Sequence, residues 1–208
     1  MNLQFREPAD INELESLFHL RHKVYLEDSL LYPMVSPNLS LDINWFDVNA
    51  LHFAGFDGIK PIAYMRIVTS SETLFSDWVK TIAEKNNIVL EKRNSEFPFQ
   101  FYYSDEKWSE NFLRQLNGKK SGEVGKLAIH KDYRRGGVVL KQLIESFIHY
   151  CKEEKNFDSG FGSCMLSLER YYRQFGFERA EGAVPFISEG LPEAVMVKFD
   201  RQKKMFSP

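Results

Sequence analysis

The sequence has few cysteines, no long apolar run and almost no net charge, and each of these features excludes a class of protein. Only Cys151 and Cys164 are present, too few for a framework of disulfide bridges. No segment approaches the roughly 20 apolar residues that a transmembrane helix needs. A formal net charge of −2 gives no global attraction to nucleic acid or to an anionic membrane. We therefore expect no membrane span and no nucleic-acid partner.

The length and composition of the chain are typical of one soluble domain. Its 208 residues can bury a sizeable core, and 43% hydrophobic with 27% charged residues are ordinary values for a globular protein. The N-terminal residues lack the basic-then-apolar pattern of a secretion signal. We therefore expect a single domain over residues 1–208 and a cytoplasmic location.

Strand and helix patterns alternate irregularly, which favours a mixed β-sheet flanked by helices, an α/β (α+β) fold. Strands are expected at residues 2–6, 50–56, 62–68, 123–129, 157–164, near 177 and at 195–199. Helices are expected after Pro8, at 72–84, around 108–112, from 138 onward and around Tyr172. Residues 29–46 are interpreted as a long loop, and 57–58 as the turn of a hairpin.

An aromatic-rich insert at about residues 88–120 contributes to the high aromatic content of 14%, with 18 Phe in the chain. Four of its aromatic residues alternate as in a strand: Phe97, Phe99, Phe101 and Tyr103. Trp108 and Phe112 follow in an expected helix. An ordinary core, a dimer face or the wall of an apolar pocket would each use such a segment.

Residues 123–139 predict a strand, a glycine turn and the start of a long helix. The turn carries Arg134, Arg135, Gly136 and Gly137, and apolar residues then recur at helical spacing up to Cys151. A helix N-terminus offers unpaired backbone N–H groups and the positive end of the helix dipole, which suit a phosphate. The two arginines add charge-assisted donors. We therefore expect a phosphate-bearing ligand at this turn.

About thirty residues further on, Tyr172 precedes Gly176 and Phe177 at the end of an expected helix. Together with the glycine turn, this spacing resembles the two signature segments of the GNAT acyltransferase superfamily. The resemblance implies the GNAT fold and a thioester donor of the CoA type. The residues that it assigns to the donor are Leu127, Ala128, Ile129, Arg134, Arg135, Gly136, Gly137, Val138 and Val139. Arg134 and Gly137 fit the family pattern, whereas Val139 stands where Gly or Ala is usual.

A second set of spaced residues resembles autoinducer (acyl-homoserine lactone) synthases and long-chain N-acyl amino acid synthases. Its members here are Arg21, Val24, Tyr25, Asp42, Asp47, Arg66 and Glu123. Asn44, Gly125 and Lys126 depart from that pattern, which argues against a homoserine-lactone synthase. The retained glycine turn also favours the N-acyl amino acid branch. The resemblance covers most of residues 15–70 and 120–180.

This resemblance implies an N-acyltransferase. It would move an acyl group, of long chain in this branch, from an acyl carrier protein or CoA thioester to the amine of an amino acid or similar small molecule. An acetyl-CoA-dependent N-acetyltransferase and a non-catalytic GNAT-like binding domain are the alternatives. The acceptor would lie near a charged cluster of Arg21, Tyr25, Asp42, Asp47 and Arg66, although a structural ion-pair network explains the same residues.

Acyl transfer to an amine needs a base for the amine, donors for the oxyanion and an acid for the leaving thiolate. Glu123 is the candidate base, or else a strand-end carboxylate paired with Lys126 or an arginine. Tyr172 is the candidate acid, or else a packed aromatic residue, with Tyr171 as its neighbour. Backbone N–H groups near Gly125 would hold the oxyanion, or Gly125 marks only a β-bulge.

The remaining expectations concern the donor and metals. The aromatic insert would suit a long acyl tail, with Phe99 and Phe101 as the slot residues to test. Basic residues would meet the acidic surface of an acyl carrier protein; they are Lys119, Lys120, Lys131, Arg134 and Arg135. His52 is interpreted as a strand residue. Histidine and cysteine positions show no metal-ligand spacing, so no metal is expected.

Overall fold

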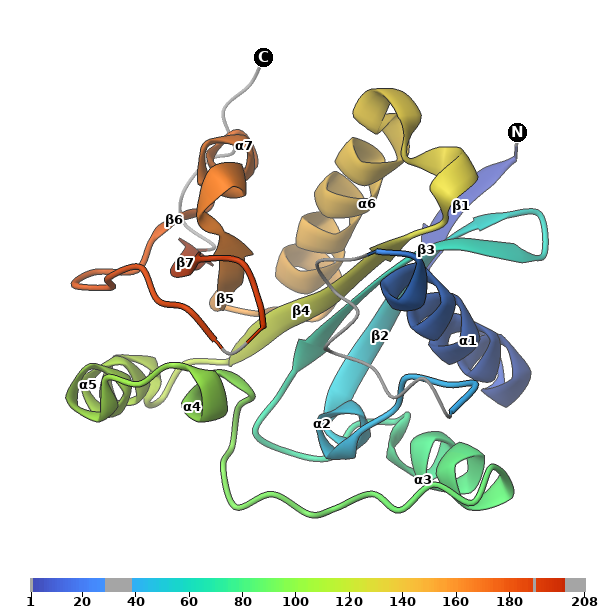
Figure 1. The fold of residues 1–208 in the computed structure, drawn as a ribbon, viewed down its shortest axis with the longest axis horizontal. Helices are drawn as coiled ribbons and strands as arrows, with labels where there is room; N and C mark the ends of the chain where they lie inside the picture. Colours follow the sequence, from blue (N-terminus) through green and yellow to red (C-terminus); the bar gives the residue numbers. More distant parts are fainter. Residues whose placement is uncertain (1, 29–38, 189, 201–208) are drawn as a thin grey trace.

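The computed structural model describes residues 2–28, 39–188 and 190–200 and shows one mixed sheet with helices on both faces (Figure 1). The strand order in this sheet is β1-β2-β3-β4-β5-β7-β6, and all described neighbours are antiparallel except β4 and β5. The strands are β1 (Leu3–Arg6), β2 (Ala50–Asp57), β3 (Lys60–Val68), β4 (Ser121–Ile129), β5 (Ser159–Met165), β6 (Glu178–Arg179) and β7 (Ala194–Asp200).

Helices α1 and α6 cover opposite faces of this sheet (Figure 1). The α-helices are α1 (Ile11–Glu27), α2 (Trp45–Val48), α3 (Ser76–Lys85), α4 (Phe99–Tyr102), α5 (Glu106–Leu116), α6 (Val138–His149) and α7 (Glu169–Arg173). Helix α6 continues as a π-helix over Tyr150–Glu154. No helix in the described ranges is long and apolar enough to cross a membrane.

Local signals in the sequence explain where the first elements begin and end. Asp10 caps α1, because its side chain accepts hydrogen bonds from the backbone N–H groups of Asn12 and Glu13. The hairpin of β2 and β3 turns at Gly58, whose φ of 62° lies in the left-handed region. The predicted hairpin, its turn and the helix after Pro8 are therefore confirmed.

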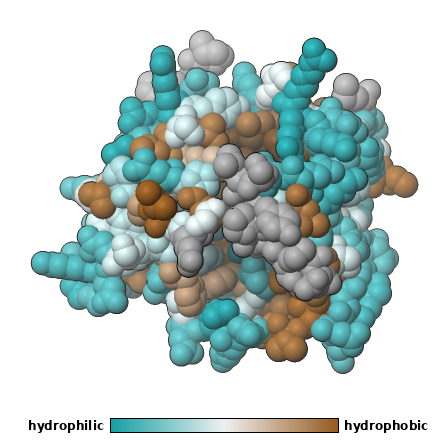
Figure 2. Space-filling view, in the orientation of Figure 1, coloured by the Kyte–Doolittle hydropathy of each residue, from teal (hydrophilic) through white to brown (hydrophobic). Residues whose placement is uncertain are grey.

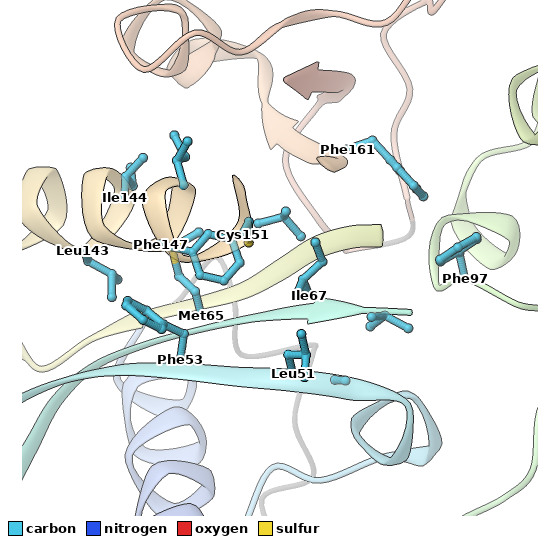
Figure 3. Packing of buried hydrophobic residues seen from close by; sticks show 14 of the residues in the cluster. Leu51, Phe53, Met65, Ile67, Phe97, Leu143, Ile144, Phe147, Cys151 and Phe161 are labelled. Carbon is cyan, nitrogen blue, oxygen red and sulfur yellow. The ribbon is translucent and has the colours of Figure 1, made fainter. Parts of the chain in front are cut away.

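The core lies between α6 and the central strands. Phe53 of β2 and Met65 of β3 point toward Leu143 and Phe147 of α6, and the rings of Phe53 and Phe147 are 5.7 Å apart (Figure 3). Cys151 is fully buried beside them, as a small core residue. Because successive side chains of a strand alternate between faces, the neighbouring residues of β2 point toward α1 instead.

Strands β4 and β5 run side by side only over a short stretch. Their pairing ends at Glu123 opposite Phe161. A Cβ atom on Gly162 would lie 2.3 Å from the Val124 carbonyl oxygen, so glycine is required for this close approach. Beyond it, β4 stays paired with β3 but bulges at Lys126, whose φ is 56°. Among the described residues, this part of β4 therefore has no neighbouring strand on the side of β5.

The expected strand at residues 97–103 is wrong, since this segment contains the short helix α4. Pro98, with φ −54° and ψ −40°, precedes the helix, and the Phe99 N–H finds an acceptor in the Glu123 side chain. Phe97 and Phe99 both reach the core by this curl, each with its ring against Phe161. The alternating aromatic residues therefore lie on and around a helical turn, and not on a strand.

Two other boundaries differ from the sequence expectation. Of the loop expected at residues 29–46, residues 29–38 lie outside the described part of the chain. Its end is wrong by a helical turn, because α2 begins at Trp45, where Asn44 and Asp47 form a capping box. The helix expected at 72–84 is present as α3 but starts later, at Ser76.

Candidate active site

A cavity of about 290 Å³ lies where β4 and β5 part. Its walls come from both strands, from α4, from the α7 region and from residues 186–194 before and at the start of β7. The lining residues are Tyr25, Arg66, Val68, Pro98, Tyr102, Glu123, Val124, Gly125, Lys126, Leu127, Ser163, Cys164, Met165, Leu168, Tyr172, Phe186, Ser188, Leu191, Pro192 and Ala194. Most of these side chains are apolar, and the charged ones, Arg66, Glu123 and Lys126, come from β3 and β4.

Glu123 is the central carboxylate of this cavity and is only 4% exposed. Its Oε1 accepts a hydrogen bond from the Tyr102 hydroxyl at 2.5 Å, and its Oε2 accepts one from the Phe99 N–H at 2.8 Å. Burial raises the pKa of Glu123 to about 7, against the opposing effects of these two donors and of Arg66. A carboxyl group that titrates near neutral pH can accept a proton from an amine.

The predicted charged residues do come together, and Arg21 is at their centre. Its guanidinium has five N–H donors, and all five are used. They meet Asp42 Oδ2 (2.7 Å), both carboxylate oxygens of Asp47 (2.8 and 2.9 Å), the Tyr64 hydroxyl (3.1 Å) and the Asp42 carbonyl. Arg21 is fully buried and does not line the cavity. Its guanidinium therefore has no donor left for a substrate.

Arg66 connects this cluster to the cavity. Its Nη1 donates to Asp47 and to Asn44, while its Nε has no hydrogen-bond partner among the described residues. Arg66 is 3% exposed and lines the cavity. An unpaired N–H of a buried guanidinium is costly, and this Nε is itself buried, so the cavity does not expose it to a ligand.

Lys126 adds a third cation to the cluster. Its Nζ donates to Asp42 Oδ2 at 2.9 Å and lies over the Tyr25 ring. Burial lowers the pKa of Lys126, while the adjacent arginines hold the pKa values of the buried Asp42 and Asp47 below their usual range. With Lys126 protonated, three buried cations face two buried anions. Glu123 is a further carboxylate near Arg66, so the charge at this wall of the cavity depends on the protonation of Lys126 and of Glu123.

His52, beside this cluster, is a strand residue of β2. It is fully buried and contacts the Tyr64 hydroxyl at 2.7 Å and the Asp47 carbonyl at 3.1 Å. Burial lowers its pKa to about 3, so the ring is neutral at physiological pH. His52 does not line the cavity.

Two predicted tyrosines line the cavity. Tyr25 is 2% exposed, and its hydroxyl donates to the Leu127 carbonyl at 3.3 Å. Tyr172 packs edge-on against Phe177, with ring centres 5.6 Å apart. Burial raises the pKa of Tyr172, so its phenol keeps its proton at neutral pH. Tyr171 is half-buried, packs on Phe175 and is not part of the cavity wall.

The glycine turn lies outside this cavity. Gly136 and Gly137 have φ values of 76° and 69°, and α6 starts at once after them. The exposed Arg134 donates from Nε to the Ile129 carbonyl at 2.9 Å. Val139 is 5% exposed, so its side chain belongs to the core of the helix and not to the surface of the turn. Of the residues assigned to the donor, only Leu127 touches the cavity.

The free edge of β4 joins the cavity to this turn. The His130 N–H donates to the Ile62 carbonyl at 2.8 Å, and Ala128 and Ile129 are the next residues paired with β3. Since antiparallel pairs alternate, the Ile129 N–H and carbonyl point away from β3. The bond from Arg134 to the Ile129 carbonyl agrees with this direction. An extended ligand could pair with β4 here as a strand would.

Several cavity residues were not predicted from the sequence, and the two residues predicted to line a slot for the acyl chain lie outside the cavity. Phe99 is fully buried in the core, and Phe101 is 54% exposed beside Phe46. From the insert, Pro98 and Tyr102 line the cavity instead. No set of residues in the described ranges has the make-up of a metal site.

Comparison with protein-family models and with curated proteins found no match. Solved structures do match over most of the chain. FeeM, an N-acyl amino acid synthase from uncultured soil microbes, aligns with a TM-score of 0.55 at 12% identity, over 97% of this chain and 92% of its own. BjaI, a CoA-dependent acyl-homoserine lactone synthase, aligns with a TM-score of 0.60 at 14% identity, over 92% of this chain and 77% of its own.

An acetyltransferase of the GNAT family from Streptococcus pneumoniae also aligns, with a TM-score of 0.51 at 13% identity, over 95% of this chain and 98% of its own. These likenesses establish the fold. The chain has the α/β fold of the GNAT acyltransferases, as its glycine turn and Tyr172 predicted.

Proposed function

We propose that this protein is an N-acyltransferase that moves an acyl group, of long chain, from a CoA or acyl-carrier-protein thioester to the amine of an amino acid or similar small molecule. The observation that carries the proposal is the position of Glu123. It is a buried carboxylate with a pKa of about 7, at the point where β4 and β5 part, in the wall of a largely apolar cavity that also contains Tyr172.

The chemistry follows from these two groups. The acceptor reacts as the neutral amine: its nitrogen lone pair attacks the thioester carbonyl carbon, and the Glu123 carboxylate takes the proton that the nitrogen then loses. Backbone N–H groups at the Lys126 bulge stabilise the oxyanion of the tetrahedral intermediate. The C–S bond then breaks, and Tyr172 gives its proton to the leaving thiolate. The products are an amide and a free thiol.

The charged wall of the cavity supports an acceptor with a carboxylate. Two cations of the cluster, Arg66 and Lys126, line the cavity and could meet such a carboxylate. An α-amino acid would offer its carboxylate to Arg66 and its amine to Glu123. A polyamine or a protein lysine would bring no such charge.

The open edge of β4 and the glycine turn support a phosphopantetheine donor. Its amide groups would pair with the free edge near Ile129, and its phosphates would lie at the N-terminus of α6, near Arg134 and Arg135. The apolar residues of the cavity wall would receive the acyl chain. The face viewed in Figure 2 carries hydrophobic patches within a largely hydrophilic surface.

The donor preference tests this proposal. Each buried CH₂ group contributes roughly 0.8 kcal/mol, or about fourfold in kcat/KM, so donors of about ten carbons or more are expected to exceed acetyl-CoA by a wide margin. The measurement is kcat/KM for a series of acyl-CoA and acyl-carrier-protein donors with one amino acid. A profile that peaks at acetyl would replace this proposal with an acetyltransferase. If none of the donors gives an amide, the proposal that this protein is an acyltransferase is wrong.

Matched variants locate the groups within the same assay. Leu191→Ala, in the cavity wall, is expected to flatten the length preference, whereas Ile187→Ala, which is 73% exposed and outside the wall, should leave it unchanged. Tyr172→Phe is expected to lower turnover by roughly 10²-fold or more, the usual effect of a general acid. Tyr171→Phe is its control. A loss under about threefold for Tyr172→Phe, well below that range, would make Tyr172 a packing residue.

A further inference from the structure

The aromatic insert supplies both hydrogen bonds that Glu123 accepts from described residues. The Phe99 N–H meets Oε2, and the Tyr102 hydroxyl meets Oε1. These two residues are the first and the last of α4, which is only four residues long. A single helical turn, far from β4 in sequence, therefore donates a hydrogen bond to each carboxylate oxygen of the candidate base.

The two oxygens of Glu123 differ in what they face. The Phe99 N–H can only donate, whereas the Tyr102 hydroxyl can donate or accept. When Glu123 is ionised, Tyr102 donates to Oε1. When Glu123 has taken a proton, Oε1–H can donate to the Tyr102 oxygen, which also accepts a hydrogen bond from the Ser163 hydroxyl on β5. The hydroxyl thus suits both protonation states of the base.

The Tyr102 hydroxyl is one of the few groups that stabilise the ionised form of Glu123. Among the described residues, the titratable groups that act on Glu123 are Tyr102 from α4 and Arg66 from β3, and both favour its ionised form against the effect of burial. Tyr172 and Cys164 line the same cavity. Burial and the nearby Glu123 raise the pKa of Tyr102 well above its ordinary value, so Tyr102 stays a phenol and does not compete for the proton.

Tyr102 is itself held in place by the other wall of the cavity. Its ring stacks on Phe186, with centres 5.6 Å apart and planes at 17°. The neighbouring Tyr103 hydroxyl accepts a hydrogen bond from the Val184 N–H at 3.1 Å. Phe186, in the segment before β7, therefore holds the Tyr102 ring in place beside Glu123, while the Tyr103 bond lies at the C-cap of α4, outside the contact with Glu123.

We propose that Tyr102 is a positioning residue for the base. It holds the Glu123 carboxylate in its reactive orientation, stabilises the ionised form and takes up the hydrogen bond of the protonated form. The proposal rests on the proposed acyl transfer for its kinetic test, although the Tyr102–Glu123 pair can be tested without it. The insert is then part of the active site and not only a wall for the acyl chain.

Tyr102→Phe tests the proposal, because it keeps the ring against Phe186 and deletes only the hydroxyl. Loss of a donor to the carboxylate raises the pKa of Glu123, so the acidic limb of the kcat/KM profile is expected to move up by about one pH unit, or tenfold in rate on that limb. The KM for the donor should change little. Tyr103→Phe removes the adjacent hydroxyl, which does not contact Glu123, and should leave the limb unchanged.

A titration that needs no turnover separates the two proposals. Carbon NMR of the ¹³C-labelled glutamate carboxyls should show the Glu123 pKa rising in Tyr102→Phe and not in Tyr103→Phe. This shift without acyl transfer from any donor would refute the proposed function and retain the positioning role. An unchanged Glu123 pKa in a folded Tyr102→Phe variant, with an unchanged pH profile, would make Tyr102 a packing residue. If Tyr102→Phe does not fold, Phe186→Leu, which weakens the ring contacts with Tyr102 and Tyr103, is expected to give a smaller shift in the same direction.

Discussion

Replacing Glu123 with glutamine is expected to lower kcat by roughly 10²–10⁴-fold, the range for loss of a general base. The same change should stabilise the fold at alkaline pH. Burial raises the pKa of Glu123 from 4.5 to about 7 in the folded protein. The wild-type protein therefore loses stability as the pH rises from the unfolded pKa through the folded one, by about 3 kcal/mol in total. Glutamine does not ionise and avoids that loss.

The measurement is the free energy of unfolding in urea at pH 5 and pH 8 for both proteins. The difference between Glu123→Gln and wild type should become more favourable to the variant at pH 8. Glu145→Gln, at a half-exposed position of α6, is the matched control and should show no such trend. If the stability difference between the variant and wild type is the same at both pH values, the pKa of Glu123 is not raised by folding, and Glu123 is not adapted to act as a base.

Asp47→Asn is expected to be among the most destabilising single changes in the chain. Asp47 is fully buried and accepts hydrogen bonds from Arg21, from Arg66 and from the Asn44 N–H. An uncharged side chain there leaves Arg21 paired with Asp42 alone and Arg66 without the carboxylate to which it donates. Breaking a buried ion pair in this way costs roughly 3–5 kcal/mol.

The matched control is Glu72→Gln, which removes the exposed pair of Glu72 with Lys80 and should change stability by about 0.5 kcal/mol or less. Both effects are read from urea unfolding at neutral pH. A loss below about 1 kcal/mol for Asp47→Asn, far short of the usual cost, would show that Arg21 and Arg66 are held by other groups.

The parts of the fold that depend on local signals were predictable from the sequence. Asp10 caps a helix, Gly58 permits a hairpin turn, and Gly136 with Gly137 turns a strand into a helix, because each acts on its own neighbours in the chain. Helix α4 was not predictable in this way. Its aromatic residues carry a pattern of period two, and the helical turn is fixed by contacts with distant residues, Glu123 and Phe161.

The candidate site was predictable only in part, for the same reason. Resemblance to known families pointed to Glu123 and Tyr172, and both line the cavity. It also grouped Arg21 with Arg66, but a pattern cannot show that all five donors of Arg21 are already used. Tyr102 gave no signal, because its role depends on a helical turn that brings it onto a strand 21 residues later in the chain.

The central claim is that the acyl chain of a thioester donor lies in the cavity between β4 and β5. A photo-reactive diazirine at the end of a long-chain acyl-CoA tests it directly, with the cross-linked peptides identified by mass spectrometry. Adducts are expected on cavity residues such as Leu168, Phe186 and Leu191, and unlabelled acyl-CoA should suppress them. Adducts confined to other parts of the protein, or adducts that unlabelled donor does not suppress, would contradict the claim.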